Sequence, residues 1–464
     1  MQTPFTNFTV VLDAARKKLE MDRAVYAGEY AGVLGDYLEE AKLFIRALAE
    51  VHGEGDALGR PFTFPIVTFM TTSKIIYEDP EVSEALWRAV ARKGFGYFLN
   101  TRVVDPDTSF AMCCRLTLNT RDAMEAAKVN KPLRLRILKR ELEEAREARI
   151  RMVERGRFGG VWAIPDVTGS KAVITVNLPR IAYTSRGEDT AFYEALDNVL
   201  EVVRAGLLWF ADRYRKLASK HPAFYMMPLK YLPEVFELYG TPYYLTVGVV
   251  GLPEAAAIFH RDPEAWHKVE KRHRARLAKW MRDVVRYIVE KARKWTAETG
   301  IPFNVEEVPA ESAAAKLAAK DVKLYREIAD YLPDPSNPIY SNSIVPYYAD
   351  YELHHRIEIE EAVQPEFTGG VMMHIFLGEE PHPEGLMKFT RYLTENTRLV
   401  YWSYTPAISV CPKCGWRTTG VQRICPRCGS ETEVWSRIVG YYRPLKNWNP
   451  ARRREFWLRR HHRV

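Results

Sequence analysis

Short apolar segments separated by long helical patterns are the feature that most limits how this chain can fold. They cover residues 62–69, 172–178, 245–251, 302–308, 343–346 and 371–378. Most are apolar nearly throughout, as is typical of parallel strands covered on both faces. Strands that alternate with helices in this way predict an α/β fold, either a barrel or an open parallel sheet.

The helical patterns between these segments have recognisable boundaries. Asp262 and Pro263, a cap residue followed by proline at the first helical position, predict a helix that ends at Gly300. A second helix is expected over about 190–220. A third, over about 132–157, is dense in Arg and Glu at i,i+3 and i,i+4 spacing, so we expect a solvated helix held by surface ion pairs.

The composition excludes several classes of protein. With 464 residues, 47% hydrophobic and 27% charged, the chain can bury a sizeable core as one large domain or a few smaller ones. No apolar run is long enough to span a membrane, and the N-terminus lacks a signal-peptide pattern. We therefore expect a cytoplasmic protein without a membrane partner.

The formal net charge of +8 favours anionic partners, such as nucleic acid, nucleotide phosphate or an acidic protein. Much of this charge lies in residues 451–464, where six arginines face a single acid, Glu455. A solvated basic tail and a phosphate-binding segment both fit this pattern.

Four of the six cysteines form a compact pattern near the C-terminus. Two Cys-x-x-Cys pairs, each followed by a glycine, can present four thiolates to one tetrahedral ion, which predicts a structural zinc site. Its ligands are Cys411, Cys414, Cys425 and Cys428. The composition also changes near residue 405, so we predict a main portion over 1–404 and a small zinc-binding module over 405–464.

The segment after these cysteines indicates in which kind of protein the zinc module occurs. Ser436-Arg437-Ile438-Val439-Gly440-Tyr441, with Trp448-Asn449-Pro450 after it, resembles the glycyl-radical module of anaerobic ribonucleotide reductases. The resemblance implies that Gly440 carries a stable carbon radical, generated by a separate iron–sulfur, S-adenosylmethionine-dependent activase. Glycine suits this role because the radical is delocalised onto both flanking amides, which a side chain would twist out of plane.

The remaining cysteines, Cys113 and Cys114, are adjacent, and by composition alone they would be a buried core pair. The family carries a cysteine directly before an arginine, so the resemblance implies that Cys114, before Arg115, forms the thiyl radical that removes the ribose 3′-hydrogen. Cys113 is the alternative, or a nearby reducing thiol. The implied reaction converts ribonucleoside triphosphates to deoxyribonucleotides, with nucleotide effectors as possible regulators.

The resemblance extends over nearly the whole chain and implies a partial ten-stranded α/β barrel of the glycyl-radical and ribonucleotide-reductase type, with a zinc-ribbon-like module at its C-terminus. The family's usual N-terminal half has no counterpart here, so we expect a second polypeptide to supply it. The segment Thr168-Gly169-Ser170 favours a thiol or redoxin reductant over formate. The substrate-binding residues expected from matching segments are Asn177, Arg180, Ser341 and Asn342.

Two other functions fit parts of the sequence. A formate-lyase-like glycyl-radical enzyme also has adjacent cysteines, but the zinc ribbon and the Ser-Arg-x-x-Gly-Tyr context favour the reductase. A zinc-ribbon nucleic-acid-binding protein that uses the basic tail would leave Cys113, Cys114 and the barrel strands unexplained, so no nucleic-acid partner is expected.

Overall fold

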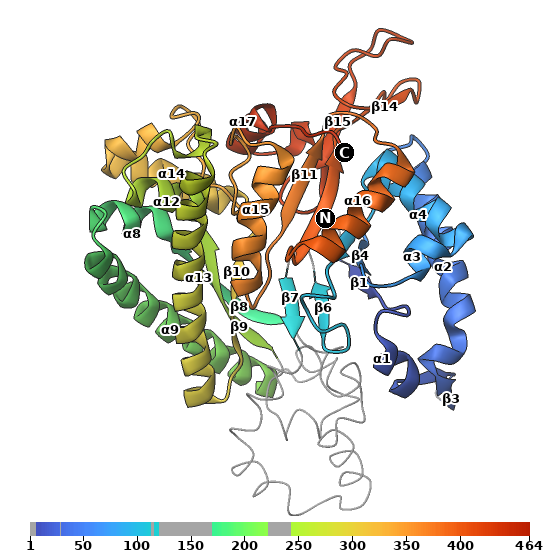
Figure 1. Ribbon diagram of the computed structural model, residues 1–464, viewed down its shortest axis with the longest axis horizontal. Coiled ribbons are helices and arrows are strands. Elements are labelled where there is room, and N and C mark those ends of the chain that lie inside the picture. Colours follow the sequence, from blue (N-terminus) through green and yellow to red (C-terminus); the bar gives the residue numbers. More distant parts are fainter. Residues whose placement is uncertain (1–5, 28, 113–115, 120–168, 221–242) are drawn as a thin grey trace, which may run out of the picture.

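The computed structural model describes residues 6–27, 29–112, 116–119, 169–220 and 243–464. A central group of strands is flanked by helices on both sides (Figure 1). The helix expected over 132–157 lies outside the described residues, as do Cys113 and Cys114. Within the described ranges the strands form two main sheets, of five and three strands, and three further sheets, of four, two and two strands.

The larger sheet has five strands in the order β1-β4-β5-β12-β11. β1, β4 and β5 run parallel to one another, β5 and β12 are antiparallel, and β12 and β11 are again parallel. The bounds are β1 (Asn7–Val10), β4 (Ile66–Met70), β5 (Tyr97–Leu99), β11 (Met373–Leu377) and β12 (Tyr401–Pro406).

The smaller sheet contains β8 (Ser170–Asn177), β9 (Tyr244–Val250) and β10 (Phe303–Glu307), all parallel. A parallel bridge between Glu306 and Gly370 joins this sheet to the chain just before β11. β8 to β12 therefore form one set of parallel strands, and β1, β4 and β5 form a second set that runs the opposite way. The α/β class was predicted from the sequence, whereas the opposite direction of the two sets was not.

Helices cover the outer faces of both sheets. On one side, α9 packs on β8 and α13 packs on β10, and on the other, α4 packs on β12 and is itself covered by α2 and α16. The bounds are α2 (Leu38–Glu54), α4 (Pro80–Lys93), α8 (Leu178–Ser185), α9 (Asp189–Lys220), α12 (Leu252–Phe259), α13 (Lys271–Thr299), α14 (Ser312–Leu324), α15 (Leu353–Val363) and α16 (Pro383–Asn396).

β10 illustrates how the strands divide their side chains. Phe303 and Val305 belong to the hydrophobic core beneath the helices, whereas Asn304 and Glu306 alternate with them and are buried on the other side. Both faces of β10 are therefore buried, one mainly apolar and one polar.

The helix over 190–220 is confirmed as α9, and the predicted stop at Gly300 is confirmed because Gly300 adopts φ 65° after α13. The predicted start of that helix is wrong. Asp262 uses its carboxylate to bind the Lys268 ammonium at 2.6 and 2.7 Å, and a short 3-10 turn, η4 (Ala265–His267), intervenes before α13 begins at Lys271.

The strand predicted over 343–346 is also wrong. Most of this segment is buried, but it pairs with no strand among the described residues. The Val345 amide instead donates to Glu360 at 3.3 Å, and the Ser343 hydroxyl donates to the Val345 carbonyl at 2.7 Å. The other five apolar segments overlap β4, β8, β9, β10 and β11. β1, β5 and β12 were not predicted.

A hairpin of β6 (Ser109–Met112) and β7 (Leu116–Asn119) frames the two adjacent cysteines. The Ala111 carbonyl of β6 accepts from Thr9 of β1 at 3.3 Å, and the Ala111 amide donates back to the Thr9 hydroxyl at 3.1 Å. Further short elements are α1 (Arg16–Met21), β2 (Arg23–Tyr26), β3 (Glu29–Val33), η1 (Leu34–Tyr37), α3 (Ile75–Glu78), η5 (Arg326–Tyr331) and η6 (Gln364–Glu366).

The C-terminal residues form an antiparallel sheet in the order β14-β13-β15-β16, followed by a helix. The predicted boundary at 404/405 falls inside β12, and the chain end returns to the barrel, where the His462 amide donates to the Phe376 carbonyl at 2.8 Å. The bounds are β13 (Ile408–Val410), β14 (Arg417–Thr419), β15 (Glu433–Arg437), β16 (Tyr442–Pro444), η7 (Leu445–Asn447) and α17 (Pro450–Leu458). Among the helices in the described part, none is long and apolar enough to cross a membrane.

Candidate active site and zinc site

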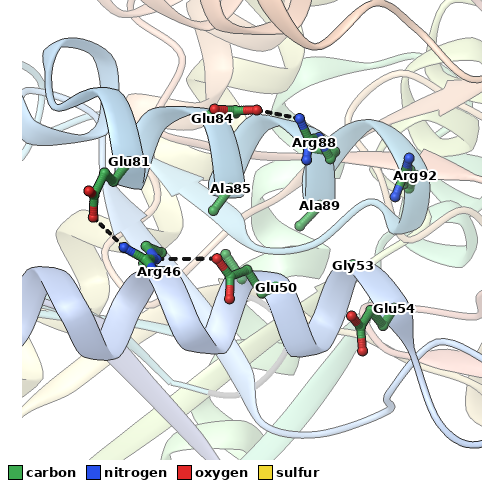
Figure 2. A pocket seen from close by; sticks show the side chains of 11 residues that line it. Arg46, Glu50, Gly53, Glu54, Glu81, Glu84, Ala85, Arg88, Ala89 and Arg92 are labelled. Atoms are coloured by element: carbon green, nitrogen blue, oxygen red, sulfur yellow. Dashed lines mark hydrogen bonds and ion pairs between the residues drawn. The ribbon is translucent and has the colours of Figure 1, made fainter.

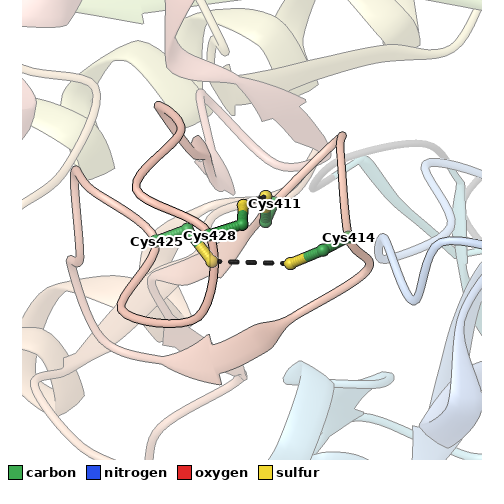
Figure 3. Close-up of side chains that lie close together, drawn as sticks. All are labelled: Cys411, Cys414, Cys425 and Cys428. Atoms are coloured by element: carbon green, nitrogen blue, oxygen red, sulfur yellow. Dashed lines mark hydrogen bonds between the residues drawn. The ribbon is translucent and has the colours of Figure 1, made fainter.

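The four predicted zinc ligands converge at the tip of the C-terminal sheet (Figure 3). Their sulfur atoms all lie within 4.8 Å of one another, with 3.5 Å between Cys411 and Cys428 and 3.6 Å between Cys414 and Cys425. Tetrahedral zinc with Zn–S bonds of about 2.3 Å requires sulfur atoms about 3.8 Å apart. The four thiols are therefore arranged as a zinc site requires.

The two glycines that follow the cysteine pairs explain how the turns close. Gly415 has φ 69° and donates its amide to the Cys411 carbonyl at 3.0 Å, and Gly429 has φ 70° and donates to the Cys425 carbonyl at 2.9 Å. Only glycine adopts this left-handed conformation without strain. Each pair thus forms the tight turn expected from the sequence.

Gly440 lies in a buried loop, 438–441, between β15 and β16. The Ile438 amide closes the loop by donating to the Tyr441 carbonyl at 3.1 Å. The Gly440 carbonyl accepts a hydrogen bond from the Tyr97 hydroxyl of β5. His374 of β11 lies with Nε2 3.4 Å from the Val439 carbonyl. The loop therefore contacts strands of the barrel sheet from both parallel sets.

Arg437 anchors the start of this loop. It is buried, and its guanidinium lies 4.6 Å from the ring centres of both Tyr97 and Tyr442. It donates to the Tyr404 carbonyl at 2.6 Å and to the carbonyls of Gly94 and Gly96. Because a planar guanidinium can donate in several directions at once, one side chain fixes β15 to two barrel strands.

Tyr441 anchors the other end of the loop. Its hydroxyl donates to Glu311 at 2.5 Å, and its ring stacks on Phe64 with 5.7 Å between ring centres. Burial, together with the bond to Glu311, raises the pKa of Tyr441 to about 12. Tyr441 thus remains a protonated donor to Glu311 at neutral pH.

Two of the predicted substrate residues surround one buried carboxylate. Asp321 of α14 is fully buried and accepts from Asn177 at 2.7 Å, from Arg180 Nε at 2.7 Å and from Tyr340 at 2.8 Å. The Arg180 side chain remains 34% exposed. The structure brings Asn177 and Arg180 together, with both already held by Asp321.

The other two predicted substrate residues form a second group. Ser341 donates its hydroxyl to Glu254 at 2.6 Å and its amide to the same carboxylate at 3.1 Å, and Asn342 donates to the Ala310 carbonyl at 2.9 Å. Burial raises the pKa of Glu254 to about 7, although the bonds from Ser341 lower it. The assignment of all four residues to substrate binding stays a prediction.

Sequence reasoning missed several residues around the glycine loop. Glu311, Tyr97 and His374 were given no role by the sequence. Arg459 was counted only as part of a basic tail. Contacts between residues so far apart in the chain leave no pattern that a single sequence reveals.

Four of the six arginines of the tail are engaged within the protein, whereas Arg453 and Arg463 are exposed. Arg452 and Arg459 are buried on Glu455, Arg454 pairs with Asp334 at 2.7 Å, and Arg460 pairs with Glu352 at 2.6 Å. The tail is therefore largely neutralised by neighbouring acids, which removes the feature on which a nucleic-acid-binding function would depend.

A groove of about 330 Å³ between α2 and α4 is lined by charged side chains (Figure 2). Arg46 pairs with Glu50 at 3.2 Å and also with Glu81, and Arg88 pairs with Glu84. Its arginines are thus largely neutralised from within, and none of its lining residues is a predicted site residue. This groove is a surface feature of two packed helices and not the candidate active site.

Solved structures define the class of fold. An anaerobic ribonucleotide reductase matches with a TM-score of 0.71 and 23% identity, over 100% of this chain and 65% of that one. The Thermotoga maritima anaerobic ribonucleotide reductase in complex with dATP and CTP matches with a TM-score of 0.67 and 23% identity, over 98% and 65%. The predicted barrel of the ribonucleotide-reductase type is confirmed.

Sequence comparisons then identify the family. The family model of anaerobic ribonucleoside-triphosphate reductase matches residues 1–462, so the chain belongs to this family. The Haemophilus influenzae anaerobic ribonucleoside-triphosphate reductase is 23% identical over 265 residues, and that of Salmonella typhimurium is 24% identical over 277 residues. These matches cover 54% and 56% of this chain but 35% and 37% of the relatives, so the match spans about a third of their length.

Proposed function

We propose that this chain is the catalytic C-terminal portion of an anaerobic ribonucleoside-triphosphate reductase that works through glycyl and thiyl radicals. The observation that carries the proposal is the buried loop that holds Gly440 against Tyr97 and His374 of the barrel strands, in a chain that belongs to this family. A radical stored there is shielded from solvent and lies beside the interior of the barrel.

The conformation of Gly440 supports a chemical reason for glycine at this position. Gly440 is not among the glycines of the described residues that adopt positive φ. A side chain could therefore adopt the same backbone angles, unlike at Gly415 or Gly429. Glycine suits the proposed radical because its α-carbon carries no side chain, so the radical can spread over both adjacent amides.

In the proposed reaction the activase removes a hydrogen atom from Gly440, and Cys114 passes a hydrogen atom to this radical to become a thiyl. The thiyl takes the 3′-hydrogen of the bound ribonucleotide, and the 2′-hydroxyl leaves as water. A dithiol, either a redoxin or one that includes Cys113, supplies two electrons and two protons and becomes a disulfide. Cys114 then returns its hydrogen to C3′, and the regenerated thiyl restores the radical at Gly440.

The β6–β7 hairpin supports Cys114 as the partner of Gly440. Its two strands flank residues 113–115, and β6 is tied to β1 through Ala111 and Thr9. The hairpin thus lies beside β1, a strand of the sheet that also contains β5, whose Tyr97 contacts the glycine loop. For the substrate, Arg180 is the best candidate among the four predicted residues because part of its guanidinium remains accessible.

Zinc bound by the four cysteines would act as a structural ion, because four thiolates leave no open coordination position. β1 and β8 each have a free edge within the described ranges. We propose that further polypeptide completes the barrel along these edges, since exposed strand edges need partners. The oxygen sensitivity of a glycyl radical implies an anoxic cytoplasm as its location.

The decisive experiment compares Gly440→Ala and Cys114→Ala after anaerobic activation. We expect Gly440→Ala to lose the organic radical signal in electron paramagnetic resonance, and Cys114→Ala to keep the signal but form no deoxynucleotide. Gly385→Ala is the control, because an added Cβ there meets only His382 at 3.9 Å. A radical that persists in Gly440→Ala would refute the assignment, and acyl transfer in place of deoxynucleotide formation would favour the formate-lyase-like alternative.

A further inference from the structure

Arg459 makes an unusual set of contacts with the backbone of the glycine loop. Its guanidinium donates to the Arg437 carbonyl at 3.0 Å and to the Ile438 carbonyl at 3.3 Å. These carbonyls belong to the residues directly before Val439 and Gly440. Arg459 is 6% exposed, so these bonds form in a site that excludes water.

Arg459 itself is held from several directions. Glu455, one turn earlier in α17, accepts from Arg459 Nε at 3.1 Å and from Nη2 at 2.8 Å. The guanidinium lies 4.4 Å from the ring centre of Phe376 and 5.1 Å from that of Trp448. On its C-terminal side, the amides of Arg460 and His462 donate to Tyr347 at 3.0 Å and Phe376 at 2.8 Å. The side chain therefore reaches the loop from a backbone fixed to the barrel.

The contacts continue from Arg459 into a closed ring. Glu455 also binds Arg452, and Arg452 donates to the Ala310 carbonyl at 2.6 Å. The next residue, Glu311, accepts from Tyr441, which follows Gly440. The backbone before the glycine and the side chain after it are thus both tied to the segment 310–311.

Lysine could not replace Arg459 in this ring. An ammonium group has the same charge, but it lacks the planar fork that reaches two carbonyls and a carboxylate together. The loss would leave buried carbonyls and the Glu455 carboxylate with fewer donors, which is costly in a site without water.

We propose that Arg459 is a positioning residue for the radical loop: through the carbonyls of Arg437 and Ile438 it keeps Gly440 inside the barrel. This inference rests on the proposed function for its role in catalysis, but its structural content can be tested without any radical.

The test measures hydrogen–deuterium exchange of the peptide 436–444 in the full-length zinc-loaded chain. We expect Arg459→Lys to raise its exchange about tenfold, because loss of bonds from a charged donor to buried acceptors corresponds to roughly that change in the opening equilibrium. Arg453→Lys is the matched control, since Arg453 lies on the same helix but is exposed. Exchange over 271–299 in α13 should not change in either variant.

Exchange in Arg459→Lys within twofold of Arg453→Lys would overturn the inference. Zinc content and thermal midpoint establish that each variant is folded. If Arg459→Lys does not fold, Tyr441→Phe tests the ring of contacts instead, because this change removes the hydrogen bond from Tyr441 to Glu311. We expect it to raise exchange about fivefold, and unchanged exchange would overturn the closed ring.

Activation separates this inference from the proposed function. We expect the glycyl radical of Arg459→Lys to decay faster than that of the wild type, and equal decay together with unchanged exchange would contradict the positioning role. If the wild type forms no glycyl radical, the proposed function fails, whereas the exchange comparison still decides whether Arg459 holds the loop.

Discussion

The zinc-site tip and the glycine loop belong to one small sheet but are held in opposite ways. Most residues over 412–432 are exposed or half-buried, and the tip projects from the body of the protein (Figure 1). Residues 436–442 are buried and bound by Tyr97, Glu311 and Arg459, which lie far away in the chain or beyond the sheet. The tip depends on its own ligands, whereas the loop depends on the rest of the protein.

Removal of a zinc ligand should have the largest effect, and it should affect the zinc-site tip but not the glycine loop. Cys425→Ser deletes a buried thiolate, so we expect bound zinc to fall from one per chain towards zero, since zinc binding supplies about 10–16 kcal/mol in small zinc domains. Metal analysis measures the loss, and deuterium exchange should rise over 411–432 but remain low over 436–444. Thr418→Ser is the control. Equal deprotection of both peptides would mean that tip and loop form one unit.

Arg437→Lys tests the loop from its barrel side. We expect it to lower the free energy of unfolding by about 3 kcal/mol, because a lysine cannot reach the carbonyls of Tyr404, Gly94 and Gly96 together. Urea denaturation of the zinc-loaded protein measures the loss. Arg443→Lys, whose side chain is 38% exposed, should change stability by less than about 0.5 kcal/mol. A loss below about 1 kcal/mol for Arg437→Lys would show that the loop does not depend on this anchor.

These contrasts also indicate what the sequence alone can reveal. The zinc ligands were predictable because Cys-x-x-Cys spacing is local chemistry. β4, β9 and β11 were predictable because buried parallel strands are continuous apolar runs. The contact between Tyr97 and Gly440 spans 343 positions, and nothing in either segment indicates it.

The predictions for residues 343–346 and for the tail arginines failed because these segments depend on contacts that form only when the chain folds. Residues 343–346 are as apolar as a strand, but Val345 bonds to a side chain, Glu360, and no strand in the described part of the chain pairs with it. The arginines of 451–464 looked solvated, yet Glu455 lies three residues after Arg452 and four before Arg459, so one carboxylate allows both to be buried. Whether a charged residue is exposed depends on partners that folding supplies.

The pH dependence of stability tests the buried pair of Glu254 and Ser341, outside the loop. Burial raises the pKa of Glu254 to about 7 from an ordinary value of 4.5. Between these values the folded protein binds more protons than the unfolded chain, so this group's contribution to stability falls as pH rises through the window and is level above it. Relative to the wild type, Glu254→Gln should therefore gain up to about 3 kcal/mol between pH 4.5 and 7. Chemical denaturation at several pH values, with the exposed Glu264→Gln as control, measures this; a difference that does not vary with pH would contradict it.

The smallest effect is expected from Tyr97→Phe. This change removes only the hydroxyl that donates to the Gly440 carbonyl and accepts from Arg437, so we expect a loss of about 1 kcal/mol. Urea denaturation measures the loss, and exchange over 436–444 should rise slightly. Tyr392→Phe, at a position 56% exposed, is the control and should have no effect. A loss equal to that of Arg437→Lys would mean that the Tyr97 hydroxyl and the Arg437 guanidinium stabilise the loop only when both are present.

The antiparallel junction between β5 and β12 has a consequence for synthesis on the ribosome. The core beneath β1, β4 and β5 combines residues from 10–98 with residues from 357–404, so it cannot close until the later part has been translated. Roughly 300 residues separate β5 from β12, which at 5–20 residues per second takes about 15–60 s. During that interval the nascent β4 and β5 present apolar side chains and an unpaired edge, and a chaperone that shields them would improve the yield of folded protein.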